Sequence, residues 1–389
     1  MAVENSAKVL AAALLLAGCS SAPLDEDEAS EPNKSLAEVA GVIGSGDGSV
    51  VFTTVYSQRL VNHATALAFN PLADDELWVT LREPDAALEQ PCTMDDPTGC
   101  DALVGRIAII SGASGAEPSA VVEVDDNSWH FLRNPTSIAF APFGAFGTCG
   151  ESRTDNYTDE PTPYAGPVLW DPALFGERAA DGQNGLHLDM LHETPYCMGI
   201  AHEIDNVYWT FNGQIGAIDR YDFKSPHPPG GEDHSDGELL RYVEGAVSRA
   251  PWVPSHLDYD ETSGWLYIAD TGNGRVVRLD TKSGTAGADV ITYDPIDVHR
   301  SMDGAVLEEV VAPGVLQLPS GLTLHDGVLF VTDNATGVIH AFSTAGEPLR
   351  SLQTGLAAGE LGGVTIGGAD GRAFVTNLKT AEVIRIDLP

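Results

Sequence analysis

Six copies of a short repeat predict an all-β protein in which six small sheets stand around a ring, a six-bladed β-propeller. Two segments show the repeat most clearly, residues 254–280 and residues 319–342. Each holds three short apolar runs separated by Gly, Asp and Asn turns, a pattern typical of strands joined by tight turns. One such sheet cannot bury its own face, so it needs neighbours of the same kind.

The first strand of the repeat can be followed through the whole chain. Its six copies are Thr65–Phe69, Pro135–Phe140, Met198–Ala201, Pro254–Asp260, Pro319–Leu324 and Gly362–Ile366. A second strand rich in β-branched and aromatic residues follows in most copies, as such residues fit a pleated surface. Successive copies lie 42 to 71 residues apart, whereas a blade needs only about 40–50. The excess must be loop, and loops on a rigid scaffold tend to carry function.

Over residues 50–389 the chain resembles the NHL-repeat family of six-bladed β-propellers. The resemblance rests on the first two strands, on the turn residues that follow the second strand, and on a third strand such as residues 382–387. These turn residues are Asp270, Asp333 and Asn377 in the last three copies. The resemblance implies six blades in a ring.

The sixth copy lacks a fourth strand, while a strand-like run, residues 50–56, precedes the first copy without a partner. We expect this run to complete the last blade and close the ring. Such closure removes an exposed sheet edge that would otherwise favour aggregation.

The N-terminal residues resemble a bacterial lipoprotein signal peptide. An apolar run, Val9–Ala17, ends in the lipobox-like sequence Leu16-Ala17-Gly18-Cys19. We therefore expect a signal over residues 1–18, lipid on Cys19, a flexible acidic tether over residues 19–48 and the propeller over residues 49–389. This predicts a lipid-anchored protein of the cell envelope, on the periplasmic side of a membrane or at the cell surface. An ordinary secretory signal is the alternative.

The chain is strongly acidic, with 57 Asp and Glu against 20 Lys and Arg and a formal net charge of -37. Nucleic acid is excluded as a natural partner, because phosphate binding relies on clustered Lys and Arg. The acidity is consistent with a soluble monomer, with attraction of cations, or with a salty habitat.

Apart from Cys19, four cysteines remain, an even number in an oxidising compartment. We predict two disulfides, Cys92–Cys100 and Cys149–Cys197. The first pair brackets a short loop. In the propeller, the second pair connects the end of a strand in blade two to the start of blade three.

In a four-stranded blade, the starts of the first strands and the turns between the second and third strands lie on one face, which we call the upper rim. Polar and aromatic groups from several blades converge there, as in a binding site. The predicted binding residues are His63, Arg82, Trp252, His256, Asp270, Asn273 and Asp333. Arg82 and Tyr196 are also candidate catalytic groups.

Two histidine pairs are candidate metal ligands. His63 and His256 stand at the starts of their first strands, near the central channel, and imidazole is a common ligand of zinc. A second candidate site is His227, His234 and Asp236, in a Pro/Gly-rich loop on the opposite, lower rim. That loop has the oxygens to hold Ca²⁺ and the imidazoles to hold a transition metal. A packed channel histidine and an ordinary exposed turn are the respective alternatives.

Two functions remain open. The first is a binding protein that recognises a peptide, glycan or protein partner on the upper rim. The second is a metal-dependent lyase or hydrolase at His63 and His256, with Arg82 and Tyr196 as polarising or acid/base groups. No nucleophile elbow, P-loop or dinucleotide-binding glycine motif supports another enzyme class.

Overall fold

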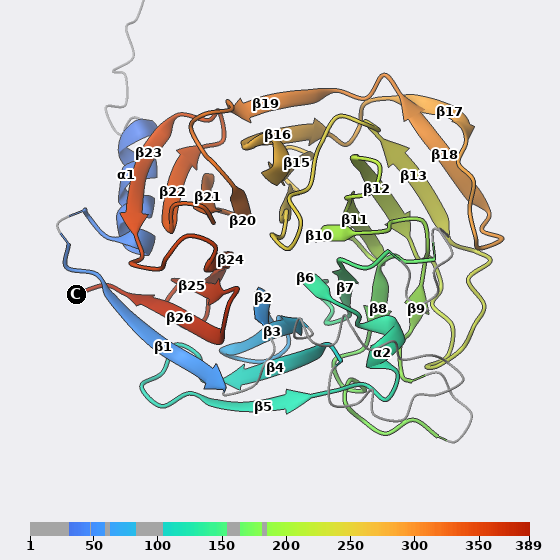
Figure 1. Cartoon of the computed structure of the whole chain (residues 1–389), viewed down its shortest axis with the longest axis horizontal. Coiled ribbons are helices and arrows are strands. Elements are labelled where there is room, and N and C mark those ends of the chain that lie inside the picture. Colours follow the sequence, from blue (N-terminus) through green and yellow to red (C-terminus); the bar gives the residue numbers. More distant parts are fainter. Residues whose placement is uncertain (1–30, 47, 59–62, 83–103, 154–163, 181–184) are drawn as a thin grey trace, which may run out of the picture.

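The computed structural model describes residues 31–46, 48–58, 63–82, 104–153, 164–180 and 185–389. Six sheets stand around a central channel (Figure 1), so the predicted six-bladed β-propeller is confirmed. Blade one contains β2 (His63–Phe69), β3 (Glu76–Arg82), β4 (Arg106–Ser111) and β5 (Ser119–Glu123); blade two contains β6 (Pro135–Phe140), β7 (Phe146–Gly150), β8 (Val168–Trp170) and β9 (Asp189–Met190); blade three contains β10 (Cys197–Ile204), β11 (Val207–Asn212), β12 (Ala217–Asp222) and β13 (Glu238–Tyr242).

The remaining blades follow in chain order, and the short helix α2 (Ser128–Phe131) lies between blades one and two. Blade four contains β14 (Leu257–Asp260), β15 (Trp265–Asp270), β16 (Arg275–Asp280) and β19 (Leu307–Val311), with a 3₁₀ turn η3 (Thr271–Asn273); blade five contains β20 (Pro319–His325), β21 (Val328–Asp333), β22 (Val338–Ser343) and β23 (Pro348–Gln353); blade six contains β24 (Leu361–Gly367), β25 (Arg372–Asn377), β26 (Ala381–Asp387) and β1 (Val51–Gln58).

The burial of the strands follows their place in the blade. Every residue of the second strands β11 and β21 is buried, because blades pack against both of their faces. The outermost strand β23 is mostly exposed or half-buried. This explains why second strands read as continuous apolar runs rather than as alternating ones.

Blade three is wider than the others. An insertion of blade four supplies β17 (Thr285–Asp289) and β18 (Val298–Asp303), and β18 pairs in parallel with the outer strand β13. The insertion also carries Tyr293 and Asp294 towards blade two, where Asp294 accepts a hydrogen bond from the backbone N–H of His192 at 3.0 Å. Residues far apart in the sequence therefore meet on the outside of blades two and three.

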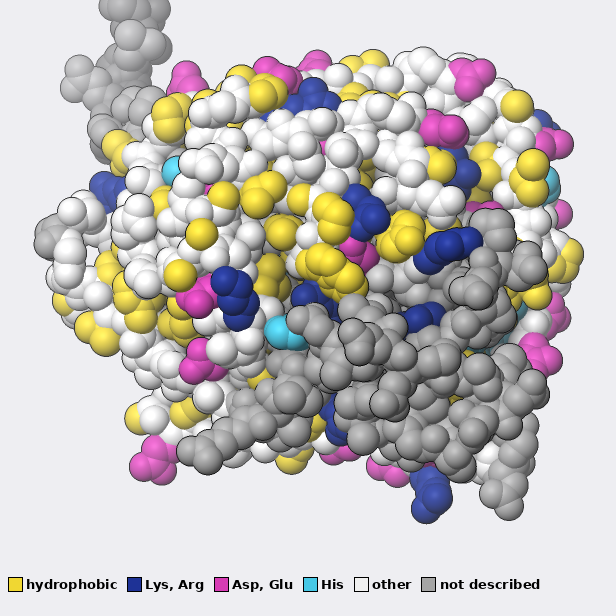
Figure 2. All heavy atoms as spheres, viewed as in Figure 1, with side chains coloured by type: hydrophobic (Ala, Val, Ile, Leu, Met, Phe, Trp, Pro, Cys, Tyr) yellow, Lys and Arg dark blue, Asp and Glu magenta, His cyan; other side chains and the backbone are white. Residues whose placement is uncertain are grey.

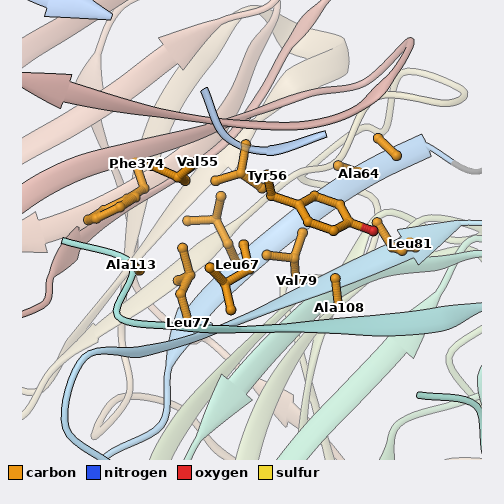
Figure 3. Close-up of a cluster of buried hydrophobic side chains, with 13 residues drawn as sticks. Val55, Tyr56, Ala64, Leu67, Leu77, Val79, Leu81, Ala108, Ala113 and Phe374 are labelled. Atoms are coloured by element: carbon orange, nitrogen blue, oxygen red, sulfur yellow. The ribbon is translucent and has the colours of Figure 1, made fainter. Parts of the chain in front are cut away.

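The ring closes as predicted. β1 pairs antiparallel with β26, from Val51 opposite Asp387 to Gln58 opposite Ala381. Val55 and Tyr56 of this strand pack into a buried cluster with Leu67 and Phe374 (Figure 3). The N-terminal strand thus joins blade six to blade one through both hydrogen bonds and apolar burial.

Buried threonine hydroxyls link successive blades near the channel. Each donates a hydrogen bond to a backbone carbonyl at the start of the next blade: Thr65 to Pro135 (2.8 Å), Thr136 to Cys197 (2.7 Å), Thr271 to Pro319 (2.6 Å), Thr332 to Gly362 (2.6 Å) and Thr376 to Thr65 (3.2 Å). These bonds cross five of the six junctions. At the junction between blades three and four the backbone N–H of Ser255 donates to the carbonyl of Met198 instead.

The predicted flexible tether over residues 19–48 differs from the structure in its second half. Helix α1 (Glu31–Ile43) packs on blades five and six, and its Val39, Val42 and Ile43 are buried in their core. The tether was predicted from the acidic composition of this segment, and the apolar residues at helical spacing within it were overlooked.

The signal and Cys19 lie outside the described residues. Over residues 31–389, as far as they are described, no helix is long and apolar enough to cross a membrane.

The disulfide between Cys149 of β7 and Cys197 of β10 is confirmed, with 5.6 Å between its Cα atoms. It joins blades two and three across a sequence separation of 48 residues. By the loop-entropy relation, closing a loop of this length stabilises the fold by roughly 4 kcal/mol. Cys92 and Cys100 lie outside the described residues, so the second pairing stays a prediction.

Ring closure gives a testable difference between two valines of β1. Val55 is 7% exposed and Val51 is 57% exposed. Val55→Asp should lower the free energy of unfolding by at least about 3 kcal/mol, since it buries an unpaired charge, while Val51→Asp should change it by less than about 0.5 kcal/mol. Urea unfolding measures both. Equal stabilities of the two variants would contradict closure by β1.

Candidate functional site

Five side chains from successive blades form a cluster on the upper rim, which we call the rim cluster: Arg82, Glu151, Tyr196, Arg249 and Trp252. Arg82 ends β3 of blade one and Glu151 follows β7 of blade two. Tyr196 precedes β10, and Arg249 and Trp252 lie in the connection from blade three to blade four. Sequence reasoning found Arg82, Tyr196 and Trp252 and missed Glu151 and Arg249, which belong to no repeated motif.

Contacts within the rim cluster hold it in one arrangement. The Arg82 guanidinium lies 5.0 Å from the Trp252 ring centroid and donates to the Trp252 carbonyl at 3.2 Å. The backbone N–H of Trp252 donates to a Glu151 carboxylate oxygen at 2.9 Å, and Arg249 pairs with the same carboxylate. The Arg249 guanidinium in turn lies 4.1 Å from the Tyr196 ring centroid. Such cation–π contacts contribute about 0.5–2 kcal/mol each.

Two aromatic residues of the rim cluster have left-handed backbones. Tyr196 has φ of 54° and Trp252 has φ of 68°, a conformation that disfavours bulky side chains and marks sites worth attention. Trp252 is nevertheless 43% exposed. The chain therefore maintains an unfavourable backbone while leaving a large apolar ring open to solvent.

The rim cluster has more basic than acidic side chains, although the chain as a whole is strongly acidic. Two guanidiniums face one carboxylate, and burial raises the pKa of Glu151, although Arg249 opposes the rise. Figure 2 shows Lys and Arg side chains around the middle of the face it presents, with most Asp and Glu side chains nearer its outline. A strongly acidic protein thus presents positive charge near the channel.

Three predicted binding residues, Asp270, Asn273 and Asp333, form hydrogen bonds that stabilise turns. Asp270 is fully buried, and its carboxylate accepts hydrogen bonds from Asn273, from Arg275 and from the backbone of Ser248. The carboxylate of Asp333 likewise accepts from the backbone N–H groups of residues 317, 318 and 335. These turn residues recur in the repeat because they fix the chain that leads into the next blade.

His256 lies in the central channel, where it lines a cavity of about 290 Å³ between the first strands of all six blades. Its Nε2 donates to the Thr136 carbonyl across the channel at 3.0 Å. A Cβ on Gly363 would lie 2.9 Å from the imidazole, so the small residue of blade six leaves room for the ring. Burial lowers the pKa of His256 to about 4, which keeps the ring neutral.

His63 and His256 do not belong to a group of three potential metal ligands anywhere in the described part of the chain. His63 pairs across β2 and β3 with Arg82, so its backbone lies beside the rim cluster. His256 uses Nε2 for the Thr136 carbonyl. The metal site at His63 and His256 therefore stays a prediction.

The one group of three metal-ligating side chains found among the described residues is Asp189, His227 and His234, whose donor atoms lie within 4.8 Å of one another. Two of these residues were predicted in the second candidate site. The third predicted residue, Asp236, is exposed, accepts from the backbone of Ser225 at 3.1 Å and does not belong to this group. Asp189 joins the two histidines because the loop between β12 and β13 packs against blade two, where the Gly230 N–H donates to the His187 carbonyl.

A cavity of about 370 Å³ adjoins this group, and we call it the side cavity. Its lining combines aromatic and titratable side chains, among them Trp129, Tyr164, His187, His192, His234 and Tyr293. The His192 Nδ1 donates to the Asp294 carboxylate at 2.8 Å, and the Tyr164 ring stacks on the His192 imidazole at 4.1 Å. This cavity was not predicted from the sequence, although His187, Asp189 and His192 lie within six residues of one another.

The channel gives a pH-dependent prediction. An unfolded histidine, with pKa 6.5, binds a proton that folded His256, with pKa about 4, does not, so this residue's contribution to stability is lost as the pH falls from 6.5 to 4. His256→Ala should therefore destabilise the protein by about 1–3 kcal/mol near neutral pH and by less near pH 5. Urea unfolding at both pH values measures this.

Asp258 of the same cavity provides the matched control. Burial raises its pKa from 3.8 to about 6, so the folded state keeps a proton that the unfolded state releases between these values. The contribution of Asp258 to the free energy of unfolding therefore rises as the pH falls. The loss of stability caused by Asp258→Asn should accordingly grow towards acid pH, whereas the loss caused by His256→Ala should shrink. A loss on His256→Ala that grows towards acid pH would contradict the buried neutral imidazole.

No family model matches the sequence, and neither does any curated protein sequence. Solved structures do match. A protein of unknown function from Bacteroides thetaiotaomicron VPI-5482 is 9% identical with a TM-score of 0.51, covering 87% of this chain and 75% of that chain. An auxiliary nutrient binding protein from Bacteroides ovatus ATCC 8483 is 11% identical (TM-score 0.48, 87% and 76% covered), and virginiamycin B lyase from Staphylococcus aureus is 10% identical (TM-score 0.45, 87% and 100% covered). Such distant similarity shows the fold alone, a six-bladed β-propeller.

Proposed function

We propose that this chain is a lipid-anchored protein of the cell envelope that binds a peptide, glycan or protein partner through the rim cluster. The observation that carries the proposal is Trp252, exposed but fixed between Arg82 and Glu151. A ring that is already held in place loses little conformational freedom when it is covered by a partner.

The composition of the rim cluster favours a peptide or protein over the other partners. Trp, Tyr and Arg are the residues most enriched among those that dominate binding energy at protein interfaces. Here one Trp and one Tyr each have an Arg guanidinium over the ring, and Glu151 connects the two pairs. The Arg249 guanidinium, which is 22% exposed, also suits a partner with a carboxylate near an apolar side chain.

Binding is better supported than the metal-dependent lyase or hydrolase at His63 and His256. That activity needs a metal held in the channel, and the His256 imidazole is neutral but already hydrogen-bonded to Thr136. Arg82 is 5% exposed and engaged with Trp252, which suits an anchoring role in binding better than an acid/base role in catalysis.

A screen of the full chain against a glycan array and a displayed peptide library tests the proposal. Ligands found in this way should bind Trp252→Ala at least about tenfold more weakly, because a central aromatic contact contributes more than about 1–2 kcal/mol. Ile291→Ala, which removes another exposed apolar side chain, is the control and should bind normally. Ligands that bind the two variants equally would place recognition elsewhere.

The anchor has its own test. Cells fed a labelled fatty acid should incorporate the label into this chain, and Cys19→Ser should abolish the incorporation and release the protein from membranes, because the thiol is the attachment point. Cys92→Ser keeps Cys19 and should remain labelled. Labelling of Cys19→Ser would show that the signal is of another kind.

A further inference from the structure

We propose that Asp189, His227 and His234 form a zinc centre whose open coordination position faces the side cavity. The three donor atoms lie within 4.8 Å of one another. They come from two blades, Asp189 from the outer strand β9 and the two histidines from the loop between β12 and β13. This proposal does not depend on the rim cluster.

The hydrogen bonds of His227 leave a nitrogen ready for a metal. Its Nδ1 lies 2.8 Å from the Pro228 carbonyl, which is only an acceptor, so Nδ1 carries the proton. The neutral ring then has its lone pair on Nε2. That atom is buried and has no hydrogen-bond partner in the described part of the chain, and His227 itself is only 8% exposed. A backbone carbonyl that fixes the tautomer in this way is the usual partner of a metal-binding histidine.

The surroundings of His227 hold the ring in place. The His187 ring meets it edge-on, with 4.9 Å between centroids. A Cβ on Gly231 would come within 2.8 Å of the His227 Nδ1, so the turn that covers the ring needs a glycine there. The ring is thus positioned before any metal arrives, which lowers the cost of ordering the site.

His234 and Asp189 are already in contact. The His234 Nδ1 lies 2.7 Å from an Asp189 carboxylate oxygen, and the His234 ring centroid lies 5.3 Å from that of His227. The side chain of Asp189 is 1% exposed. A buried carboxylate between two imidazoles is costly to desolvate without a cation, and a divalent ion would neutralise it.

The types of ligand atom indicate which metal the site would bind. Two imidazole nitrogens and one carboxylate oxygen suit zinc, whereas Ca²⁺ takes six to eight oxygens. Three protein ligands leave one position of a tetrahedral zinc open for water or another donor, as in catalytic rather than structural sites.

The side cavity indicates what could occupy that position. His234 belongs both to the metal group and to the cavity wall. The wall also offers the rings of Trp129, Tyr164 and Tyr293, and the buried Nε2 of His192, which has no partner among the described residues. Because the Asp294 carboxylate accepts the hydrogen bond of His192 Nδ1–H, Nε2 can accept a hydrogen bond. These features fit a small aromatic molecule that carries one metal-binding donor and one hydrogen-bond donor.

Zinc titration of the chelated and dialysed full chain tests the centre. The wild type should bind about one zinc per chain. His227→Ala and His234→Ala should each raise the Kd at least about 100-fold, since even outer partners of metal ligands are worth about 10–100-fold. Asp236→Asn, in the same loop but outside the group, should bind as the wild type does. Melting of the metal-free variants shows whether they fold.

Two measurements on the wild type make the result independent of the variants. X-ray absorption of the zinc-loaded chain should show two imidazole ligands. Visible absorption of the cobalt-loaded chain should change when imidazole is added, because an open position accepts it. A wild type that retains no zinc, calcium that displaces zinc, His227→Ala with unchanged affinity, or a spectrum without imidazole ligands would overturn the centre. A cobalt spectrum that ignores imidazole would overturn the open position.

Discussion

The ring of hydrogen bonds from buried threonine hydroxyls to the start of the next blade is the constraint on which the rest of the structure depends. At five of the six junctions a hydroxyl of one blade satisfies a carbonyl of the following one. Each bond contributes only about 1 kcal/mol, but a buried carbonyl left without a donor costs more. The spacing between neighbouring blades is therefore fixed at the channel, and loops further out can vary without disturbing it.

Both candidate sites take their positions from this rigid centre. The rim cluster draws its members from three connected blades, and its aromatic residues keep strained backbones because the surrounding blades hold them. The side cavity uses the outside of the ring, where the insertion of blade four reaches blade two and where the disulfide between Cys149 and Cys197 ties blades two and three together. Long loops thus build both sites on blades two and three, and the rim cluster also includes Arg82 of blade one.

The sequence predicted the fold well and the candidate sites only in part. Strand order, ring closure and one disulfide follow from repeated local patterns, which sequence displays directly. The surroundings of three predicted residues differ from those that the sequence suggests, because neighbouring loops contact them. Asp270 and Asp333 have the pattern of exposed rim residues, yet their carboxylates are buried and accept hydrogen bonds from backbone N–H groups of neighbouring loops. Asp236 looks like a ligand because it is near His234 in sequence, whereas the carboxylate next to His234 in space is Asp189.

The sequence by itself determined the six blades, since each repeat encodes a sheet that needs identical neighbours. It also determined that His256 stands where other copies of the repeat have a small residue, so the channel must have room for its imidazole. Only the tertiary structure decided where that ring lies, between the Thr136 carbonyl and Gly363. It alone also decided that α1 docks, and that His227, His234 and Asp189 meet. Contacts between blades depend on distances that the repeat does not encode, because the loops that make them are the parts in which the copies differ.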